Sequence, residues 1–168
     1  MAAGAVTVPL HATTPPDHAE HIVRDAGATI AFVGGPGQYA NLSRVRGPSG
    51  PLTRIVAFDA GIALDLTDSC SLSVPLAHPV SPKLAARADA ARLDDVATII
   101  YTSGTTGEPK GVVLTFENLV TQFEGLDAYF QVTERDRSLC FLPLSHAYER
   151  AWTFYILHRG AQNFYLED

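Results

Sequence analysis

The sequence predicts an α/β fold in which a mainly parallel sheet is flanked by helices. Short apolar runs rich in β-branched residues alternate with segments whose apolar residues recur at helical spacing, which is the order of parallel α/β units. Glycine and proline clusters separate these segments. One apolar run, residues 96–101, leads directly into a loop rich in Gly, Ser and Thr, and it predicts a buried strand.

The first half of the chain predicts a strand–helix–strand unit followed by weaker elements. Thr14-Pro15-Pro16-Asp17 predicts a helix start with Thr14 as the N-cap, and Gly27 predicts the helix end. His18 and His21 are expected on a solvent-exposed face of this helix. The other elements predicted here are a strand over 5–10, a strand over 29–33, a turn at 34–37, a helix over 39–45, a strand over 54–58, mostly loop over 59–79 and a helix over 81–92.

The second half predicts a helix capped by Thr115 and several short strands. Apolar residues on one face of that helix indicate that it packs on a sheet; they are Leu119, Phe123, Leu126 and Phe130. The remaining predictions are strands over 112–115, 138–142 and 162–166 and a helical segment around 152–156.

Composition narrows the class of protein. The 168 residues suit one domain or part of one, and the net charge of −6 without a basic block argues against a nucleic-acid partner. Cys70 and Cys140 stand far apart, which is typical of a reducing compartment and predicts a cytoplasmic protein. No apolar run approaches the roughly 20 residues that span a bilayer, so no transmembrane segment is predicted. The sequence leaves peripheral contact with a membrane as an open alternative.

The most informative stretch is Tyr101-Thr102-Ser103-Gly104-Thr105-Thr106-Gly107-Glu108-Pro109-Lys110-Gly111-Val112. Its glycines allow backbone N–H groups to approach an anion, and its hydroxyl groups add donors. Lys110 adds a mobile positive charge. Such a loop suits a polyphosphate. It is not a Walker A loop, because Glu108 and Pro109 separate Gly107 from Lys110. A plain flexible turn is the alternative for any Gly/Ser/Thr cluster, but this residue order is far more specific.

This order resembles the phosphate loop of the adenylate-forming (AMP-binding) superfamily, which includes acyl-CoA synthetases, luciferases and peptide-synthetase adenylation domains. A second stretch, Leu142-Pro143-Leu144-Ser145-His146-Ala147-Tyr148-Glu149-Arg150, is similar to the next motif of that superfamily. Its Ser-His-Ala-Tyr-Glu-Arg form resembles the long-chain fatty-acid–CoA ligase branch. His146 alone is more often structural, but after a strand and downstream of a phosphate loop it is a candidate pocket residue.

The resemblance implies two half-reactions. A fatty-acid carboxylate attacks the α-phosphate of ATP, and the thiol of CoA then attacks the acyl-adenylate and releases AMP. The resemblance assigns Thr102 to the Mg²⁺ site and His146 to the acyl or adenylate pocket. It makes Lys110 the catalytic cation, because this lysine would neutralise phosphate charge. The residues it places around the β- and γ-phosphates are Ser103, Gly104, Thr105, Thr106, Gly107 and Lys110.

The resemblance spans nearly the whole chain, and we expect residues 1–168 to be an internal fragment of the large N-terminal domain. The family's later tyrosine-glycine-threonine-glutamate segment, its ribose-binding aspartate and its small C-terminal domain with a catalytic lysine are expected outside this sequence. The fragment alone is therefore expected to be inactive. Two alternatives stay open: a non-catalytic remnant or binding module, and an aryl-CoA ligase or peptide-synthetase adenylation domain.

Overall fold

The structure is a computed structural model, and it describes residues 4–46, 50–59, 61–103 and 107–166. The chain divides into two compact units. The N-terminal unit comprises residues 12–87 and 101–111, and the C-terminal unit comprises residues 1–11, 88–100 and 112–168.

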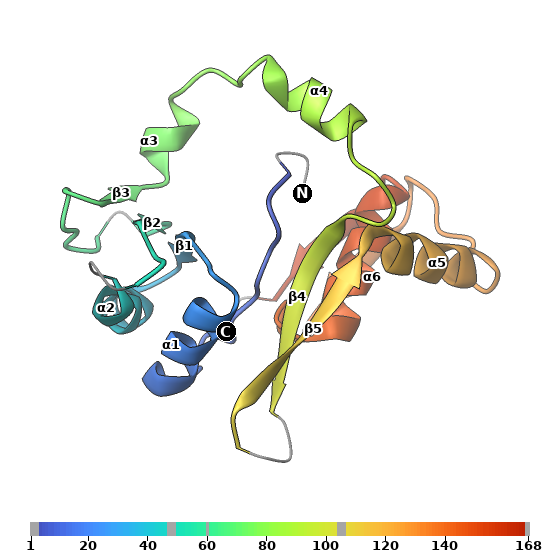
Figure 1. Cartoon of the computed structure of the whole chain (residues 1–168). Helices are drawn as coiled ribbons and strands as arrows, with labels where there is room; N and C mark the ends of the chain where they lie inside the picture. Colours follow the sequence, from blue (N-terminus) through green and yellow to red (C-terminus); the bar gives the residue numbers. More distant parts are fainter. Residues whose placement is uncertain (1–3, 47–49, 60, 104–106, 167–168) are drawn as a thin grey trace. The chain divides into compact units, whose positions relative to one another are not determined.

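A parallel three-stranded sheet forms the centre of the N-terminal unit (Figure 1). The strands lie in the order β1-β2-β3, and both pairings are parallel, with Ile30 opposite Arg54 and Ile55 opposite Ser69. The predicted α/β class with a mainly parallel sheet is confirmed. The elements that begin in this unit are α1 (Pro16–Asp25), β1 (Ile30–Val33), α2 (Pro36–Val45), β2 (Arg54–Ala57), β3 (Ser69–Ser71), α3 (Ser73–Leu76) and α4 (Lys83–Asp89).

Helix α1 ends where the sequence predicts. Gly27 lies one residue beyond the C-cap with φ +61°, and the Ala28 N–H donates to the Val23 carbonyl at 3.0 Å. This is the glycine-terminated Schellman arrangement, in which a positive φ is needed to turn the chain. The predicted N-cap is wrong: Pro15 occupies that position, and it makes no side-chain cap hydrogen bond. Two consecutive prolines set the entry of the chain instead, with Pro16 in the first turn.

Three other predictions for the first half need correction. Residues 5–10 form no strand, because only Thr7 bridges to Thr98, and Pro9 has no N–H to extend the pairing. The segment 59–79 is mostly loop, as predicted, and its two short elements are β3 and α3. Helix α2 begins three residues earlier than predicted, at Pro36, and α4 covers only Lys83–Asp89 of the helix predicted over 81–92.

The C-terminal unit combines a parallel strand pair with two helices. Strands β6 and β7 pair in parallel, with Arg137 opposite Gln162 and Cys140 opposite Tyr165. Strands β4 and β5 are hydrogen-bonded neighbours that form a hairpin (Figure 1). The base of the hairpin belongs to this unit and its tip to the N-terminal unit. The elements are β4 (Val96–Ser103), β5 (Pro109–Thr115), α5 (Phe116–Asp127), β6 (Arg137–Cys140), α6 (Ala147–His158) and β7 (Gln162–Tyr165).

The core of the C-terminal unit centres on Tyr155 of α6, whose side chain is 0% exposed. Ile156 and Ala161 are buried beside it, and partly buried apolar residues pack against this cluster; they are Phe123, Leu126, Val132 and Trp152. The apolar face of α5 therefore contacts α6, and Leu119 on the same helix lines a pocket with residues of β4 and β5. The ring of Trp152 meets Phe130 edge to face.

The start of α5 confirms the predicted cap. The Thr115 hydroxyl accepts the Asn118 N–H at 3.4 Å, and the Asn118 side chain accepts the Thr115 N–H at 2.9 Å. This reciprocal capping box satisfies donors that a helix start leaves unpaired. Cys70 and Cys140 are both free thiols. Among the described residues, no helix combines the length and the apolar character needed to cross a membrane.

Candidate phosphate loop and the second motif

The tip of the β4–β5 hairpin carries the predicted phosphate-binding residues. Thr102 and Ser103 end β4, Gly107 precedes β5, and Lys110 is the second residue of β5. The predicted residues Gly104, Thr105 and Thr106 lie outside the described residues. Thr102 and Lys110 are exposed, and no ion pair among the described residues includes Lys110. The hairpin thus carries an exposed hydroxyl group near the end of β4 and an exposed lysine near the start of β5.

Gly107 has a backbone conformation that few other residues adopt. Its φ is +93°, while the space that a side chain would enter is open, because no heavy atom lies within 4 Å of an ideal Cβ. The restriction therefore comes from the backbone rather than from crowding. A glycine here leaves the approach to the neighbouring N–H groups open, as an anion-binding turn requires.

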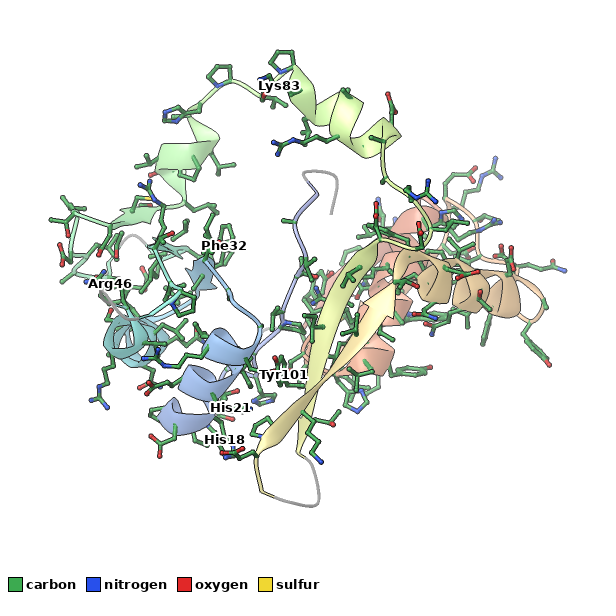
Figure 2. The ribbon with its side chains drawn as sticks, in the orientation of Figure 1. His18, His21, Phe32, Arg46, Lys83 and Tyr101 are labelled. Carbon is green, nitrogen blue, oxygen red and sulfur yellow. The ribbon has the colours of Figure 1, made fainter. Side chains whose placement is uncertain are left out.

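Helix α1 anchors both strands of the hairpin near its tip, within the N-terminal unit. The Tyr101 hydroxyl donates to Asp25 Oδ2 at 2.5 Å, and His21 Nε2 lies 3.0 Å from the Pro109 carbonyl oxygen (Figure 2 labels His21 and Tyr101). Burial, reinforced by Asp25, raises the pKa of Tyr101 to about 12, so the hydroxyl keeps its proton at neutral pH. The prediction of a solvent-exposed histidine face holds for His18, but His21 is half-buried and bonded.

The described tip residues fit the chemistry of a magnesium-bound triphosphate. Mg²⁺ prefers oxygen ligands and usually keeps ligands from water and from substrate phosphates. Thr102 can offer one hydroxyl oxygen, and the described part of the chain contains no cluster of three His, Cys, Asp or Glu residues. At this tip Thr102 would offer one ligand to a metal, and Lys110 would be a second source of positive charge near the phosphates.

The second motif forms the turn between β6 and α6, in the C-terminal unit. His146 is the N-cap of α6: its Nδ1 accepts the Tyr148 N–H at 3.3 Å, and its own N–H donates to the Pro143 carbonyl at 2.8 Å. With Nδ1 accepting, the neutral ring carries its proton on Nε2. His146 and the hairpin tip belong to different units, so the structure groups Thr102, Ser103, Gly107 and Lys110 but does not group His146 with them.

Glu149 is a buried carboxylate that the sequence did not assign to a role. Its side chain is 3% exposed, and Oε2 accepts the Leu142 N–H at 3.4 Å, while Oε1 has no partner among the described residues. Burial, and then Glu149 itself, raise the pKa of the Cys140 thiol to about 11. Glu149 therefore ties the first turn of α6 back to the end of β6 and shapes the turn that carries His146. Its position three residues after His146, in the first helical turn, was the only signal.

We expect Glu149→Ala to lower the free energy of unfolding by about 1–3 kcal/mol, because it leaves the Leu142 N–H without an acceptor. Glu149→Gln keeps an acceptor and removes a buried charge, so it should stay within about 1 kcal/mol of the parent. Urea denaturation and hydrogen exchange of the Leu142 amide measure both effects. Glu124→Ala, an exposed glutamate of α5, is the matched control. Unchanged exchange at Leu142 in Glu149→Ala would contradict the assigned contact.

Comparison with known proteins places the chain in a family. The family profile described as "AMP-binding enzyme" matches residues 1–168. The chain belongs to this family of adenylate-forming enzymes, as the two motifs predict.

Its relatives include long-chain acyl-CoA ligases. The long-chain-fatty-acid–CoA ligase FadD15 of Mycobacterium bovis is 38% identical over 163 residues, which cover 94% of this chain and 26% of that protein. The long chain acyl-CoA synthetase 2 of Arabidopsis thaliana is 32% identical over 171 residues, covering 96% of this chain and 26% of that protein. The chain thus spans about a quarter of the length of these curated relatives.

Solved structures support the fold. A crystal structure titled as a putative long-chain-fatty-acid CoA ligase from Rhodopseudomonas palustris CGA009 superposes with a TM-score of 0.78 at 21% identity. The match covers 96% of this chain and 38% of that one. At this identity the likeness shows the fold, which is that of the N-terminal domain of adenylate-forming enzymes.

Proposed function

We propose that this chain contributes the phosphate-binding part of an ATP-dependent long-chain fatty-acid–CoA ligase. The observation that carries the proposal is the phosphate-loop sequence on the β4–β5 hairpin, with an exposed Lys110 that has no ion-pair partner among the described residues. The Ser-His-Ala-Tyr-Glu-Arg sequence at the start of α6 and the relatives that carry the name long-chain-fatty-acid–CoA ligase support the substrate class.

In the proposed reaction, a carboxylate oxygen of the fatty acid attacks the α-phosphorus of ATP, and pyrophosphate leaves. The CoA sulfur then attacks the acyl carbon, and AMP leaves with the bonding electron pair. Carboxylates are weak nucleophiles, so positioning and charge neutralisation supply most of the rate enhancement. Mg²⁺ would screen phosphate charge when bound.

Each proposed site residue acts on a defined part of ATP or of the acyl group. Lys110 and the loop residues hold the β- and γ-phosphates, and Thr102 contributes one ligand to the metal. His146 lines the acyl or adenylate pocket, with its Nε2–H as donor.

The experiment that tests the proposal transplants this chain into a relative. Residues 1–168 replace the matching quarter of FadD15, and the chimera is assayed for palmitoyl-CoA formation with ATP, Mg²⁺ and CoA. The 168-residue chain alone runs in parallel and is expected to form no product, because residues that act together are not replaced by the remaining ones. We expect the chimera to form palmitoyl-CoA.

A substrate panel separates the alternatives. Benzoate and a mixture of amino acids test the aryl-CoA ligase and the peptide-synthetase domain, respectively. A folded chimera that activates either of these in preference to palmitate overturns the long-chain assignment. A folded chimera that activates no carboxylate favours a non-catalytic remnant. Product formed by the 168-residue chain alone, above a purification control, contradicts the proposal that the chain needs further segments.

A further inference from the structure

A small apolar cavity of 170 Å³ lies within the C-terminal unit, between the β4–β5 hairpin and the helices α5 and α6. Its apolar walls include Ile100, Leu114, Leu119, Ala151 and Phe154. An engineered protein cavity of about 150 Å³ with similar walls holds a benzene molecule. The cavity is therefore large enough for a short stretch of hydrocarbon.

One charged residue, Arg150, lines this cavity. Its Nη2 donates to Thr7 Oγ1 at 2.6 Å, and its Cζ lies 5.2 Å from the centre of the Phe154 ring. Its Nε is buried and has no hydrogen-bond partner among the described residues. No ion pair of the described part of the chain includes Arg150, although burial lowers its pKa.

The adjacent residues Glu149 and Arg150 do not neutralise each other. Glu149 is hydrogen-bonded to Leu142, two residues beyond β6, whereas Arg150 is bonded to Thr7 and lines the cavity. A guanidinium keeps its charge in proteins and offers several donors in a planar fork that matches a carboxylate. Arg150 thus joins a charge without an ion-pair partner among the described residues to a place in the wall of an apolar cavity, which is complementary to an anionic head on an apolar chain.

We propose that this cavity binds the carboxylate end of an apolar chain, with Arg150 holding the carboxylate through its fork. The assignment rests on the proposed function for the identity of the ligand, which is then the free fatty acid before activation. Arg150 would capture the acid and keep it ionised, which is the form that attacks phosphorus. Neither the sequence motifs nor the comparisons assign a ligand to Arg150.

The test is an NMR titration of the isotope-labelled chimera with hexanoate, in the absence of ATP, Mg²⁺ and CoA. The Nε–H signal of Arg150, assigned by its loss in Arg150→Gln, is followed. We expect hexanoate to shift this signal and to bind at least tenfold more tightly than acetate, which lacks the tail, or hexanol, which lacks the charge. Arg150→Gln should weaken hexanoate binding about ten- to a hundredfold. Arg150→Lys should restore part of the affinity, since it keeps the charge without the fork.

Arg159→Gln is the matched control, because Arg159 caps the other end of α6 and donates to the Val132 carbonyl. It should leave hexanoate binding unchanged. Equal binding of hexanoate and hexanol overturns the proposal. An Arg150 signal that hexanoate does not shift also overturns it, because it would mean that another carboxylate of the protein already occupies the guanidinium. Because the titration contains no ATP, these outcomes are independent of palmitoyl-CoA formation, so either proposal can fail while the other stands.

Discussion

Lys110→Ala is expected to slow the adenylation half-reaction of the FadD15 chimera about a hundred- to a thousandfold. Pyrophosphate leaves during adenylation, and a cation beside its oxygens stabilises the charge that develops on them. Removal of one preorganised electrostatic contact costs roughly 2.7–4 kcal/mol in a comparable oxyanion site. The exposed ammonium of Lys110, without an ion-pair partner among the described residues, is available for this role.

Thiol attack on the acyl-adenylate releases AMP and involves no β- or γ-phosphate, so this second half-reaction should be almost unaffected. A paired assay measures pyrophosphate release from ATP and palmitate, and CoA consumption from supplied palmitoyl-adenylate. Lys110→Arg should restore part of the first rate only, because a planar fork differs from a compact ammonium. Equal losses in both half-reactions would mean that Lys110 shapes the whole pocket, and its phosphate role would have to be abandoned.

Tyr155→Ala is expected to lower the free energy of unfolding by about 3–5 kcal/mol, as for other large aromatic residues in a core. The ring is fully buried in the cluster of α5 and α6, and its hydroxyl donates to Asp127 Oδ1 at 2.7 Å. Burial and Asp127 both raise the pKa of Tyr155, so the hydroxyl is protonated and acts as the donor at neutral pH. A loss of this size is a large share of the stability of an ordinary domain.

Urea denaturation of the chimera measures this effect, with fluorescence of Trp152, which contacts the Tyr155 ring, as a local probe. Tyr155→Phe keeps the ring and loses only the hydrogen bond, so it should cost about 0.5–1.5 kcal/mol. Tyr129→Ala is the matched control, since that side chain is 87% exposed. A similar loss in Tyr129→Ala and Tyr155→Ala would show that the α5–α6 cluster is not the core of the unit.

The pattern of the sequence predicted the elements that depend on local chemistry. Gly27 ends α1 and Thr115 caps α5, because the helix ends need a positive φ and a side-chain acceptor within a few residues. Thr14 shows the limit of the same logic, since Pro15 displaced it as N-cap. Strand pairing between distant segments was harder to predict from the sequence. Residues 5–10 have the composition of a strand, but only Thr7 forms a bridge, to Thr98.

For the candidate sites, the sequence identified residues whose motif is contiguous and missed residues defined by distant partners. The order of the loop residues around Lys110 was sufficient to predict a phosphate site, which stays a prediction. The contacts of Asp25 with Tyr101 and of Arg150 with Thr7 join segments far apart in the chain, and no local pattern encodes them. The sequence shows that Glu149 is an acid in a first helical turn, but it does not show that the side chain is buried near β6.

The two contacts between α1 and the hairpin have a consequence for ligand affinity. Tyr101 and Pro109 flank the phosphate-loop residues, and α1 holds one atom of each in place. Bringing the ends of a loop together has an entropic cost. Here the ends are held when the N-terminal unit folds, so this entropy is lost during folding and not during ligand binding. At the proposed phosphate site, a triphosphate would meet a loop whose flanking residues are already held by α1, so mutations that remove these contacts are expected to weaken nucleotide binding.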